Sequence, residues 1–198
     1  MKKLLIHTCC GPCFSYIQDD ISKNGMPYNG ARLDVDMTAI WYNPNIHPKM
    51  EYEKRKETLI NFCKLKNCKV EVIDEYDLDN FVKYVVNNVG EGKSKKYHIR
   101  CEYCYYRRLE KVFKFAKDNR YDIVSTTLTI SPYQNHELIQ KVGKKLQEKY
   151  NIEFVYMDYR KHFWEGQKMA KDLGLYRQKY CGCIYSIDSG KWEYSKYE

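Results

Sequence analysis

Three cysteines fall within five positions near the start of the chain, in the stretch HTCCGPC, directly after the apolar run KLLI. Thiols at a strand end can form a disulfide, act as a redox dithiol or bind a metal. Because adjacent side chains diverge on extended backbone, we expect Cys9 and Cys10 to straddle a larger cluster or to bind two neighbouring metal atoms. Gly11 and Pro12 predict a tight turn into a helix, which would return Cys13 to the same side. Small residues in a buried core are the alternative.

Two more cysteine pairs have spacings that suit metal or redox chemistry. Cys101 and Cys104 form C-x-x-C at the predicted start of a helix. Both thiolates would share one helix face, and a helix N-terminus favours their charge. Cys181 and Cys183 are separated by one glycine, and a disulfide in so small a ring should be strained and easily reduced. We interpret this pair as redox-active, with metal binding as the alternative.

The remaining cysteines, Cys63 and Cys68, are predicted to be core or bystander residues. No H-x₃₋₅-H pattern accompanies the others, so a zinc finger is a poor fit. Iron–sulfur clusters, in contrast, are held by Cys thiolates, often four. The residues favour a redox metalloenzyme whose cluster ligands would be Cys9, Cys10, Cys101 and Cys104, and whose free thiols would be Cys13, Cys181 and Cys183.

Length and charge set the frame for this chemistry. The 198 residues predict one α/β domain, 1–198, large enough to bury a core without disulfides. A net charge of +8 suits a polyanionic partner such as nucleic acid. The alternative is that the charge only forms a solvated basic surface. The N-terminal apolar run is too short for a signal peptide, and no run is long enough to span a membrane. We therefore expect a cytoplasmic protein without a membrane partner, where nine cysteines indicate metal binding or catalysis.

Short β-rich runs alternate with longer helical stretches, which predicts an α/β fold with a mostly parallel sheet flanked by helices. The predicted strands are 3–8, 36–43, 69–74, 121–128 and 152–159. The predicted helices are 14–24, 48–66, 78–89, 101–119 and 131–150. The last of these should begin with Ser131 as cap, Pro132 at the first position and Gln134 closing a capping box. The segment 90–100 is predicted to be a loop, and the tail beyond about 189 to be peripheral.

Polar candidates follow four of the predicted strands at their C-terminal ends. Cys9 and Cys10 follow the first strand, and the segments 42–45, 126–132 and 158–160 follow the second, fourth and fifth. Since the C-terminal ends of parallel strands share one edge, we expect the metal site at this edge, near the topological switch point.

These motifs, in this order, resemble the QueH-type epoxyqueuosine reductases. The matching pieces are HTCCGPC, WYNPNIHP followed by EYEKRK, RCEYCYYRRLE, STTLTISPYQNHELI, FVYMDYR and GLYRQKYCGCIYS, from residue 4 to about 186. The resemblance implies reduction of the epoxide of epoxyqueuosine, at the wobble position of tRNA, to give queuosine. It also implies a fold of the adenine-nucleotide hydrolase and PP-loop type, a [4Fe-4S] cluster and a nearby additional iron. Its implied cluster ligands are Cys9, Cys10, Cys101 and Cys104, and its implied redox pair is Cys181 and Cys183.

The implied reaction needs two electrons and releases the epoxide oxygen as water. A [4Fe-4S] cluster passes one electron at a time, so the Cys181/Cys183 dithiol or an adjacent iron could store the second, and an open iron position could polarise the oxygen. Asp158 is a candidate acid, with an ion pair to Arg160 or a cap as the alternative. The electron donor is not identified by the sequence.

For tRNA, the basic balance predicts phosphate contacts, and an unstacked base would be gripped by an aromatic ring. Candidate rings are Tyr42, Tyr133 and Tyr176, and the helix predicted from Ser131 could offer N–H groups to a phosphate.

Two rival functions fit part of this pattern. A PP-loop tRNA thiolase shares the expected fold, cluster and substrate class, but it needs a Gly/Ser-rich phosphate loop after the first strand, where this chain has HTCCGPC. A metal-stabilised RNA-binding module would need only four ligands and leaves the surplus thiols unexplained.

Overall fold

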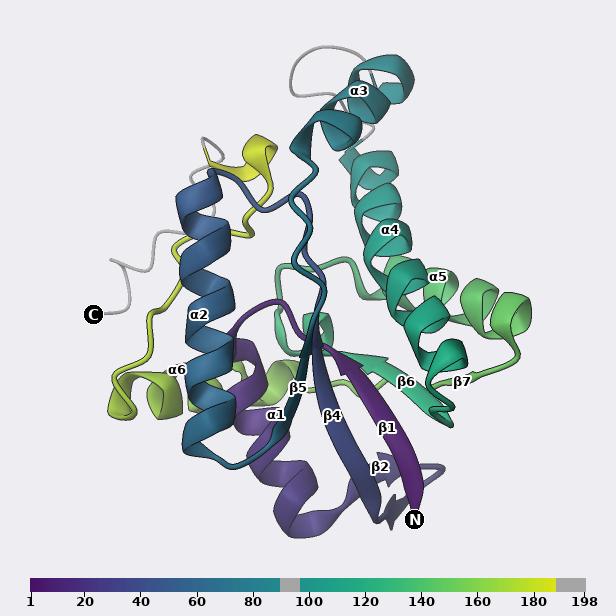
Figure 1. Cartoon of the computed structure of the whole chain (residues 1–198), viewed down its shortest axis with the longest axis vertical. Helices are drawn as coiled ribbons and strands as arrows, with labels where there is room; N and C mark the ends of the chain where they lie inside the picture. Colours follow the sequence, from purple (N-terminus) through teal and green to yellow (C-terminus); the bar gives the residue numbers. More distant parts are fainter. Residues whose placement is uncertain (90–96, 188–198) are drawn as a thin grey trace.

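A central buried strand organises the computed structural model, which describes residues 1–89 and 97–187 (Figure 1). The strand is β1, and two parallel strands flank it on each side in the order β5-β4-β1-β6-β7. The strand bounds are β1 (Lys2–His7), β4 (Val35–Trp41), β5 (Lys69–Val72), β6 (Ile123–Thr126) and β7 (Glu153–Phe154). The chain moves from β1 outward through β4 and β5 and then returns to β6, so the switch point lies between β1 and β6.

Helices cover both faces of this sheet. Figure 1 shows α1, α2 and α6 on one side of the sheet and α4 and α5 on the other, with α3 beside the start of α4 beyond the strand ends. The helix bounds are α1 (Gly11–Asn24), α2 (Lys49–Leu65), α3 (Leu78–Val89), α4 (Tyr97–Asp118), α5 (His136–Tyr150) and α6 (Phe163–Asp172). A short antiparallel hairpin, β2 (Met26–Tyr28) and β3 (Ala31–Leu33), joins α1 to β4. Within the described residues, no helix combines the length and apolarity needed to cross a bilayer.

The predicted fold class is confirmed, since the sheet is parallel and sandwiched by helices. Apolar residues of β1 and of the helices on each face form one core, in which Leu5, Phe14 and Phe113 are fully buried. The last four residues of β1 are all buried, because helices cover both faces of the sheet. This is why the apolar run KLLI predicts a buried strand.

The largest error of the sequence prediction concerns the helix expected from Ser131. This helix, α5, begins at His136, and Asn135 caps it by accepting the Leu138 N–H at 3.0 Å. Ser131 instead accepts the N–H of Tyr133, in a turn that follows the 3-10 segment η1 (Thr127–Ile130). The predicted cap at Ser131, with Pro132 and Gln134, is therefore wrong, because two consecutive short turns separate β6 from the helix.

Other boundaries also differ. The strand expected at 152–159 is only β7, because the chain leaves the sheet edge for the 3-10 turn η2 (Arg160–His162). Helix α4 begins at Tyr97, so residues 97–100 are helical although a loop was predicted, while 90–96 and the tail beyond 189 lie outside the described residues. The sequence prediction missed α6 and the β2–β3 hairpin, whose short strands lack a clear period.

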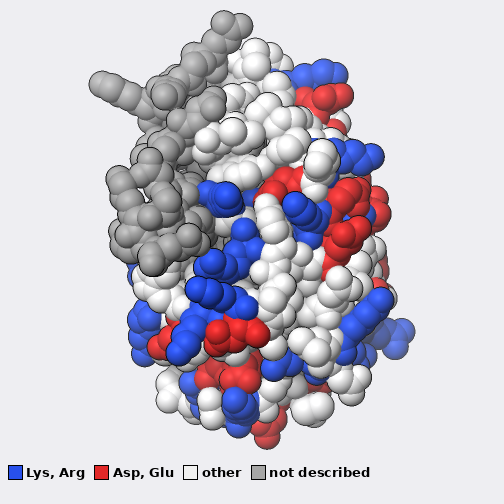
Figure 2. Space-filling view, turned by 90° about the vertical axis from the view of Figure 1, so that its left-hand side faces the viewer, with Lys and Arg blue, Asp and Glu red and all other residues white. Residues whose placement is uncertain are grey.

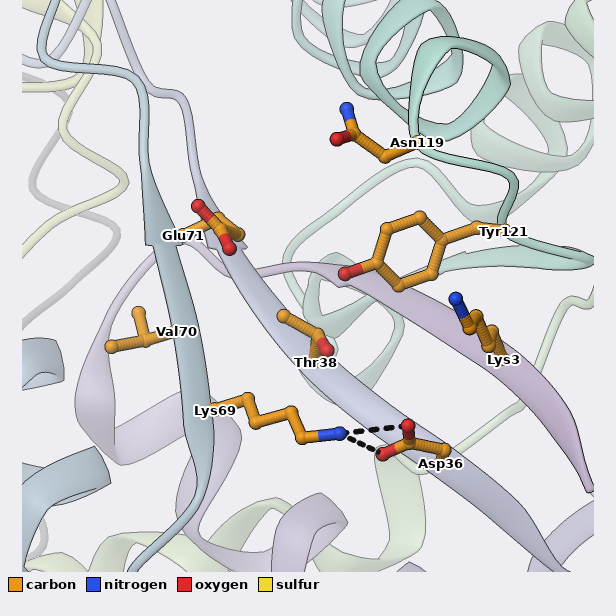
Figure 3. A pocket seen from close by; sticks show the side chains of 8 residues that line it. All are labelled: Lys3, Asp36, Thr38, Lys69, Val70, Glu71, Asn119 and Tyr121. Carbon is orange, nitrogen blue, oxygen red and sulfur yellow. Dashed lines mark hydrogen bonds and ion pairs between the residues drawn. The ribbon is translucent and has the colours of Figure 1, made fainter.

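A polar hollow of about 500 Å³ lies beside the first residues of β1, β4 and β5 (Figure 3). Two lysines and two acidic residues balance its charge, and Lys69 Nζ lies 2.7 Å from both carboxylate oxygens of Asp36. It is lined by Lys3, Asp36, Thr38, Lys69, Val70, Glu71, Asn119 and Tyr121. The hollow contains no cysteine and lies toward the strand starts, so it is separate from the edge where the thiols gather.

One close contact between α5 and the edge strand gives a testable prediction. A Cβ on Gly143 would lie 2.1 Å from Cδ1 of Phe154, so Gly143→Ala forces Phe154 out of its place. We expect overpacking to destabilise the protein by about 1–3 kcal/mol, which exceeds the helix-propensity gain of up to about 1 kcal/mol. Urea unfolding measures this difference. The exposed neighbour Lys144→Ala should change stability by less than about 0.5 kcal/mol, and a stabilised Gly143→Ala would contradict the packing.

Candidate metal centre and thiol site

Three buried thiols meet where β1 turns into α1. The Sγ atoms of Cys9, Cys10 and Cys13 all lie within 4.8 Å of one another, and those of Cys9 and Cys10 are 3.8 Å apart. The expected divergence of Cys9 and Cys10 is wrong, because the chain bends at Cys9 before the helix begins. The predicted return of Cys13 to the same side is confirmed.

The start of α1 explains this arrangement. Cys10 is extended and caps the helix, and its Sγ accepts the backbone N–H of Cys13 at 3.4 Å. Pro12 suits the first helical turn, where its missing N–H has no role. On the other side of the switch point, Thr127 supports Cys9: its Oγ1 accepts the Cys9 N–H at 3.2 Å and lies 3.5 Å from the Cys9 Sγ.

Burial and mutual hydrogen bonds divide the charge among these thiols unequally. Hydrogen bonds from Cys10 and Cys13 hold the pKa of Cys9 well below its usual range. Burial raises the pKa of Cys10 well above its usual range, and hydrogen bonds to Cys10 and Cys9 do the same for Cys13. Three cysteine sulfurs this close together are a donor set that suits a soft, thiolate-binding metal group.

The remaining thiols of the predicted site form a second group. Cys104, Cys181 and Cys183 belong to an apolar cluster with Phe81 and Val85 of α3. Cys101 precedes Cys104 by three residues on α4, and burial, together with Cys181 and Cys104 nearby, raises the pKa of Cys101 to about 12. Burial also raises the pKa of Cys183.

This grouping bears on the predicted roles. Cys101 lies in the second turn of α4, so the expected stabilisation of its thiolate by a helix start is outweighed by burial. All nine cysteines are free thiols, and no disulfide joins Cys181 to Cys183 in the structure. The predicted ligand set, Cys9, Cys10, Cys101 and Cys104, spans both groups and stays a prediction.

A buried arginine holds the loop that carries Cys181 over the first group. Arg55 of α2 donates from Nη2 to the carbonyl of Tyr180 at 2.9 Å and from Nη1 to that of Cys181 at 3.2 Å. Its Nε lies 2.6 Å from Oε1 of Glu51, whose other oxygen accepts the Tyr176 hydroxyl at 2.6 Å. The rigid guanidinium group of Arg55 therefore fixes the position of this loop relative to α2.

Only glycine fits between the two cysteines of this loop. Gly182 has φ +96°, and a Cβ there would lie 2.9 Å from Nη1 of Arg55. Its carbonyl accepts the His47 N–H at 2.8 Å, which ties the loop to the segment after β4.

Beneath the first group lies a buried, neutral histidine. His7 is fully buried, and burial, followed by the nearby Arg108 charge, lowers its pKa to about 4. Its Nε2–H donates to the Tyr42 carbonyl at 3.2 Å, so the unprotonated Nδ1 accepts from Thr126 Oγ1 at 2.9 Å. His7 therefore links the ends of β1, β4 and β6.

The structure separates the other predicted site residues from the thiols or buries them. Asp158 forms an ion pair with Arg160 at 2.5 Å, and this hydrogen bonding lowers its pKa to about 2. Tyr42 is buried and Tyr176 is bound to Glu51, whereas Tyr133 is 45% exposed. Of the three tyrosines, Tyr133 is the one with an exposed side chain, and its ring meets that of Phe163 edge to face.

Four polar side chains contact the sulfurs; two of them lie in the segments 42–45 and 126–132, which the sequence analysis placed at the same sheet edge, and the other two were not placed there. The four are Asn45, Thr127, Gln134 and Gln178. Their positions offered a signal, since the first three follow strands β4 and β6 at the same sheet edge and Gln178 precedes Cys181 by three residues.

Comparisons with known proteins agree with this site. The family model described as epoxyqueuosine reductase QueH matches residues 4–189. The protein of that name from Thermotoga maritima is 33% identical over 194 residues, covering 94% of this chain and 91% of its own. The protein of that name from Dehalococcoides mccartyi is 32% identical over 184 residues, covering 93% of this chain and 92% of its own.

A solved structure shares the fold. The U34-tRNA thiolase NcsA from Methanococcus maripaludis, with its [4Fe-4S] cluster, has a TM-score of 0.55 and 15% sequence identity. The match covers 95% of this chain and 62% of that one. The likeness confirms the PP-loop type of architecture that the sequence resemblance implied.

The arginine that holds the Cys181 loop gives a second prediction. Arg55→Leu leaves the buried Glu51 carboxylate unpaired, so we expect a loss of about 3–5 kcal/mol in the free energy of unfolding. Denaturant titration of the metal-free protein measures it. Lys23→Ala removes an exposed ion pair of the same i,i+4 spacing and should cost only about 0.3–0.5 kcal/mol. Equal losses in the two variants would argue against a structural role for Arg55.

Proposed function

This chain belongs to the epoxyqueuosine reductase QueH family, and on that basis we propose that it reduces the epoxide of epoxyqueuosine in tRNA to give queuosine. The proposed target lies at the wobble position, and the reaction is the last step of queuosine formation. One observation of the structure supports the proposal most strongly: a buried trio of thiols lies at the switch point.

The donor set fits an iron–sulfur group. Cys thiolates are the usual ligands of such clusters, and the trio combines burial, one favoured thiolate and N–H donors to sulfur. We propose a [4Fe-4S] cluster, with an additional iron nearby, and Cys9, Cys10, Cys101 and Cys104 as its ligands. Cys13 shares the first group and competes with Cys101 or Cys104 for a ligand position. When bound, the cluster would supply electrons one at a time.

The reaction must deliver two electrons and two protons to the epoxide, whose oxygen leaves as water while the two carbons become an alkene. The Cys181/Cys183 dithiol can supply these two electrons and two protons, because it releases them when it forms a disulfide. Both thiols are reduced in the structure. Phe81 and Val85 pack beside Cys183 and keep bulk water from it. An external donor would then reduce the disulfide again.

For tRNA, we propose that basic side chains contact phosphates and that Tyr133 stacks on the unpaired base. Tyr133 is exposed and lies in the turn after β6, at the same sheet edge as the thiols. On the side of the molecule that carries α2, Lys and Arg are interspersed with Asp and Glu (Figure 2). Contacts with phosphates are therefore expected from scattered basic groups rather than from one broad basic patch. The nine free thiols suit the reducing cytoplasm, where we place the reaction.

The thiolase alternative shares the fold but needs a site for ATP phosphates after the first strand. At that position the Cys10 sulfur accepts the N–H of Cys13, so a thiol occupies the start of the helix where a phosphate would bind. This contact favours the reductase.

The proposed function is tested on the full chain, purified without air and reconstituted with iron and sulfide. We expect a brown protein that, with a strong reductant, converts epoxyqueuosine in tRNA to queuosine in nucleoside analysis. Addition of ATP should change nothing. A brown protein that leaves the epoxide intact would contradict the reductase, and ATP-dependent thiolation of the tRNA would establish the alternative.

Single Cys→Ala variants assign the thiols. We expect Cys9→Ala and Cys10→Ala each to lose the iron–sulfur absorption, because each substitution removes one proposed ligand of the first group. Cys181→Ala should keep the absorption and lose turnover, because a redox thiol is missing. Cys63 is buried on α2, and its thiol hydrogen bonds with Cys68 rather than with a thiol of either group, so Cys63→Ala is the matched control and should keep both properties. Retained iron in Cys9→Ala would remove that residue from the ligand set.

The ion pair of Asp158 predicts the outcome at the candidate acid. A carboxyl group with a pKa of about 2 is protonated only below that pH, so at neutral pH it has no proton to donate. We therefore expect Asp158→Asn to keep the turnover of the unmodified enzyme. A loss of about a hundredfold, the lower end for a general acid, would restore Asp158 to the mechanism.

A further inference from the structure

Three side-chain carboxamides direct their NH₂ groups at sulfurs of the two thiol groups. Gln178 Nε2 lies 3.0 Å from Cys10 Sγ and 3.5 Å from Cys13 Sγ. Asn45 Nδ2 lies 3.2 Å from Cys104 Sγ, and Gln134 Nε2 lies 3.4 Å from Cys181 Sγ. In each case the amide and its cysteine come from different segments of the chain, so the contacts depend on the tertiary fold.

The neighbours of two of these amides fix which end faces the sulfur. Arg108 donates from Nε and Nη2 to Oδ1 of Asn45 at 3.1 and 3.0 Å, and a guanidinium can only donate. The Tyr105 hydroxyl accepts the Asn135 N–H at 3.1 Å and donates to Oε1 of Gln134 at 2.7 Å. In both amides the oxygen therefore accepts from these donors and the NH₂ group lies at the sulfur, and the Cys104 Sγ also lies 3.7 Å from Oδ1 of Asn45.

The amide of Gln178 also directs its NH₂ group at sulfur, as its contacts and burial show. Its side chain is buried, both contacts of Nε2 are sulfurs, and its Oε1 is buried without a hydrogen-bond partner among the described residues. A buried polar atom without a partner is costly to folding, and an apolar side chain of similar length would avoid that cost. The N–H groups of Gln178 therefore point to a role at the sulfurs beyond filling space.

We propose that Gln178 is a positioning residue that donates N–H···S hydrogen bonds to Cys10 and Cys13 and thereby raises the reduction potential of the iron–sulfur group that the Cys10 thiolate helps to hold. The inference rests on the iron–sulfur site of the proposed function. An added electron increases the negative charge on the ligand sulfurs, and N–H donors stabilise that charge, so the reduced state gains more than the oxidised state. Asn45 and Gln134 extend the same pattern to Cys104 and Cys181.

The test replaces the amide by an apolar side chain of similar length, Gln178→Met, in the full reconstituted chain. Redox titration followed by electron paramagnetic resonance gives the midpoint potential. We expect a roughly tenfold lower ratio of reduced to oxidised protein at a fixed poise, equivalent to about 59 mV for one electron. The matched control is Gln167→Met, since Gln167 is also buried with an unpartnered Oε1 but carries no hydrogen bond to a sulfur within the described residues. Its potential should not move.

A second variant and a spectroscopic readout guard against a simple loss of structure. Gln178→Glu keeps the length and polarity of the side chain but cannot donate when ionised, so its potential should also fall. Iron–sulfur stretching bands in resonance Raman spectra should shift in D₂O for the unmodified protein, and this shift should shrink in both variants. Unchanged potentials and isotope shifts in both variants would overturn the inference. A starting protein that binds no iron would overturn the iron–sulfur site of the proposed function itself.

Discussion

The burial of sulfur at the diverging ends of parallel strands is the constraint on which the rest of this structure depends. Cys9 and Cys10 sit where β1 and β6 lead in different directions, and their thiols have almost no contact with water. In such a place every charge or polar atom must find a partner inside the protein. Thr127, the start of α1 and the amide of Gln178 supply those partners for the first thiol group.

The same constraint explains the long loop after α6. This loop brings Gln178 and Cys181 to the sheet edge from the far end of the sequence, and it has no sheet or helix hydrogen bonds of its own at these positions. Arg55 replaces them by donating to two consecutive carbonyls, and Glu51 neutralises the buried guanidinium. The loop is therefore held by α2 rather than by its own backbone, which allows thiols from both ends of the chain to share one region.

The likeness to a tRNA thiolase shows how one fold can serve different chemistry. The sheet order and the use of the strand ends belong to the fold, whereas the function depends on the side chains placed there. In this chain the start of α1 is occupied by a cysteine sulfur, and two thiol groups surround it. In this chain those side chains are cysteines, whose thiols are suited to metal binding and redox chemistry.

The sequence by itself determined the fold class and the sheet edge at which Cys9 and Cys10 lie. These features depend on local patterns: the apolar runs that mark strands, their alternation with helices, and the close spacing of HTCCGPC and C-x-x-C. The start of α5 could not be predicted in the same way, because Ser131 and Asn135 are both good caps and the turn after β6 selects the second. Only the tertiary structure decided that Cys104 lies with Cys181 and Cys183, and that carboxamides face the sulfurs. Those contacts join segments separated by tens of residues, and their geometry is set by packing rather than by any local spacing.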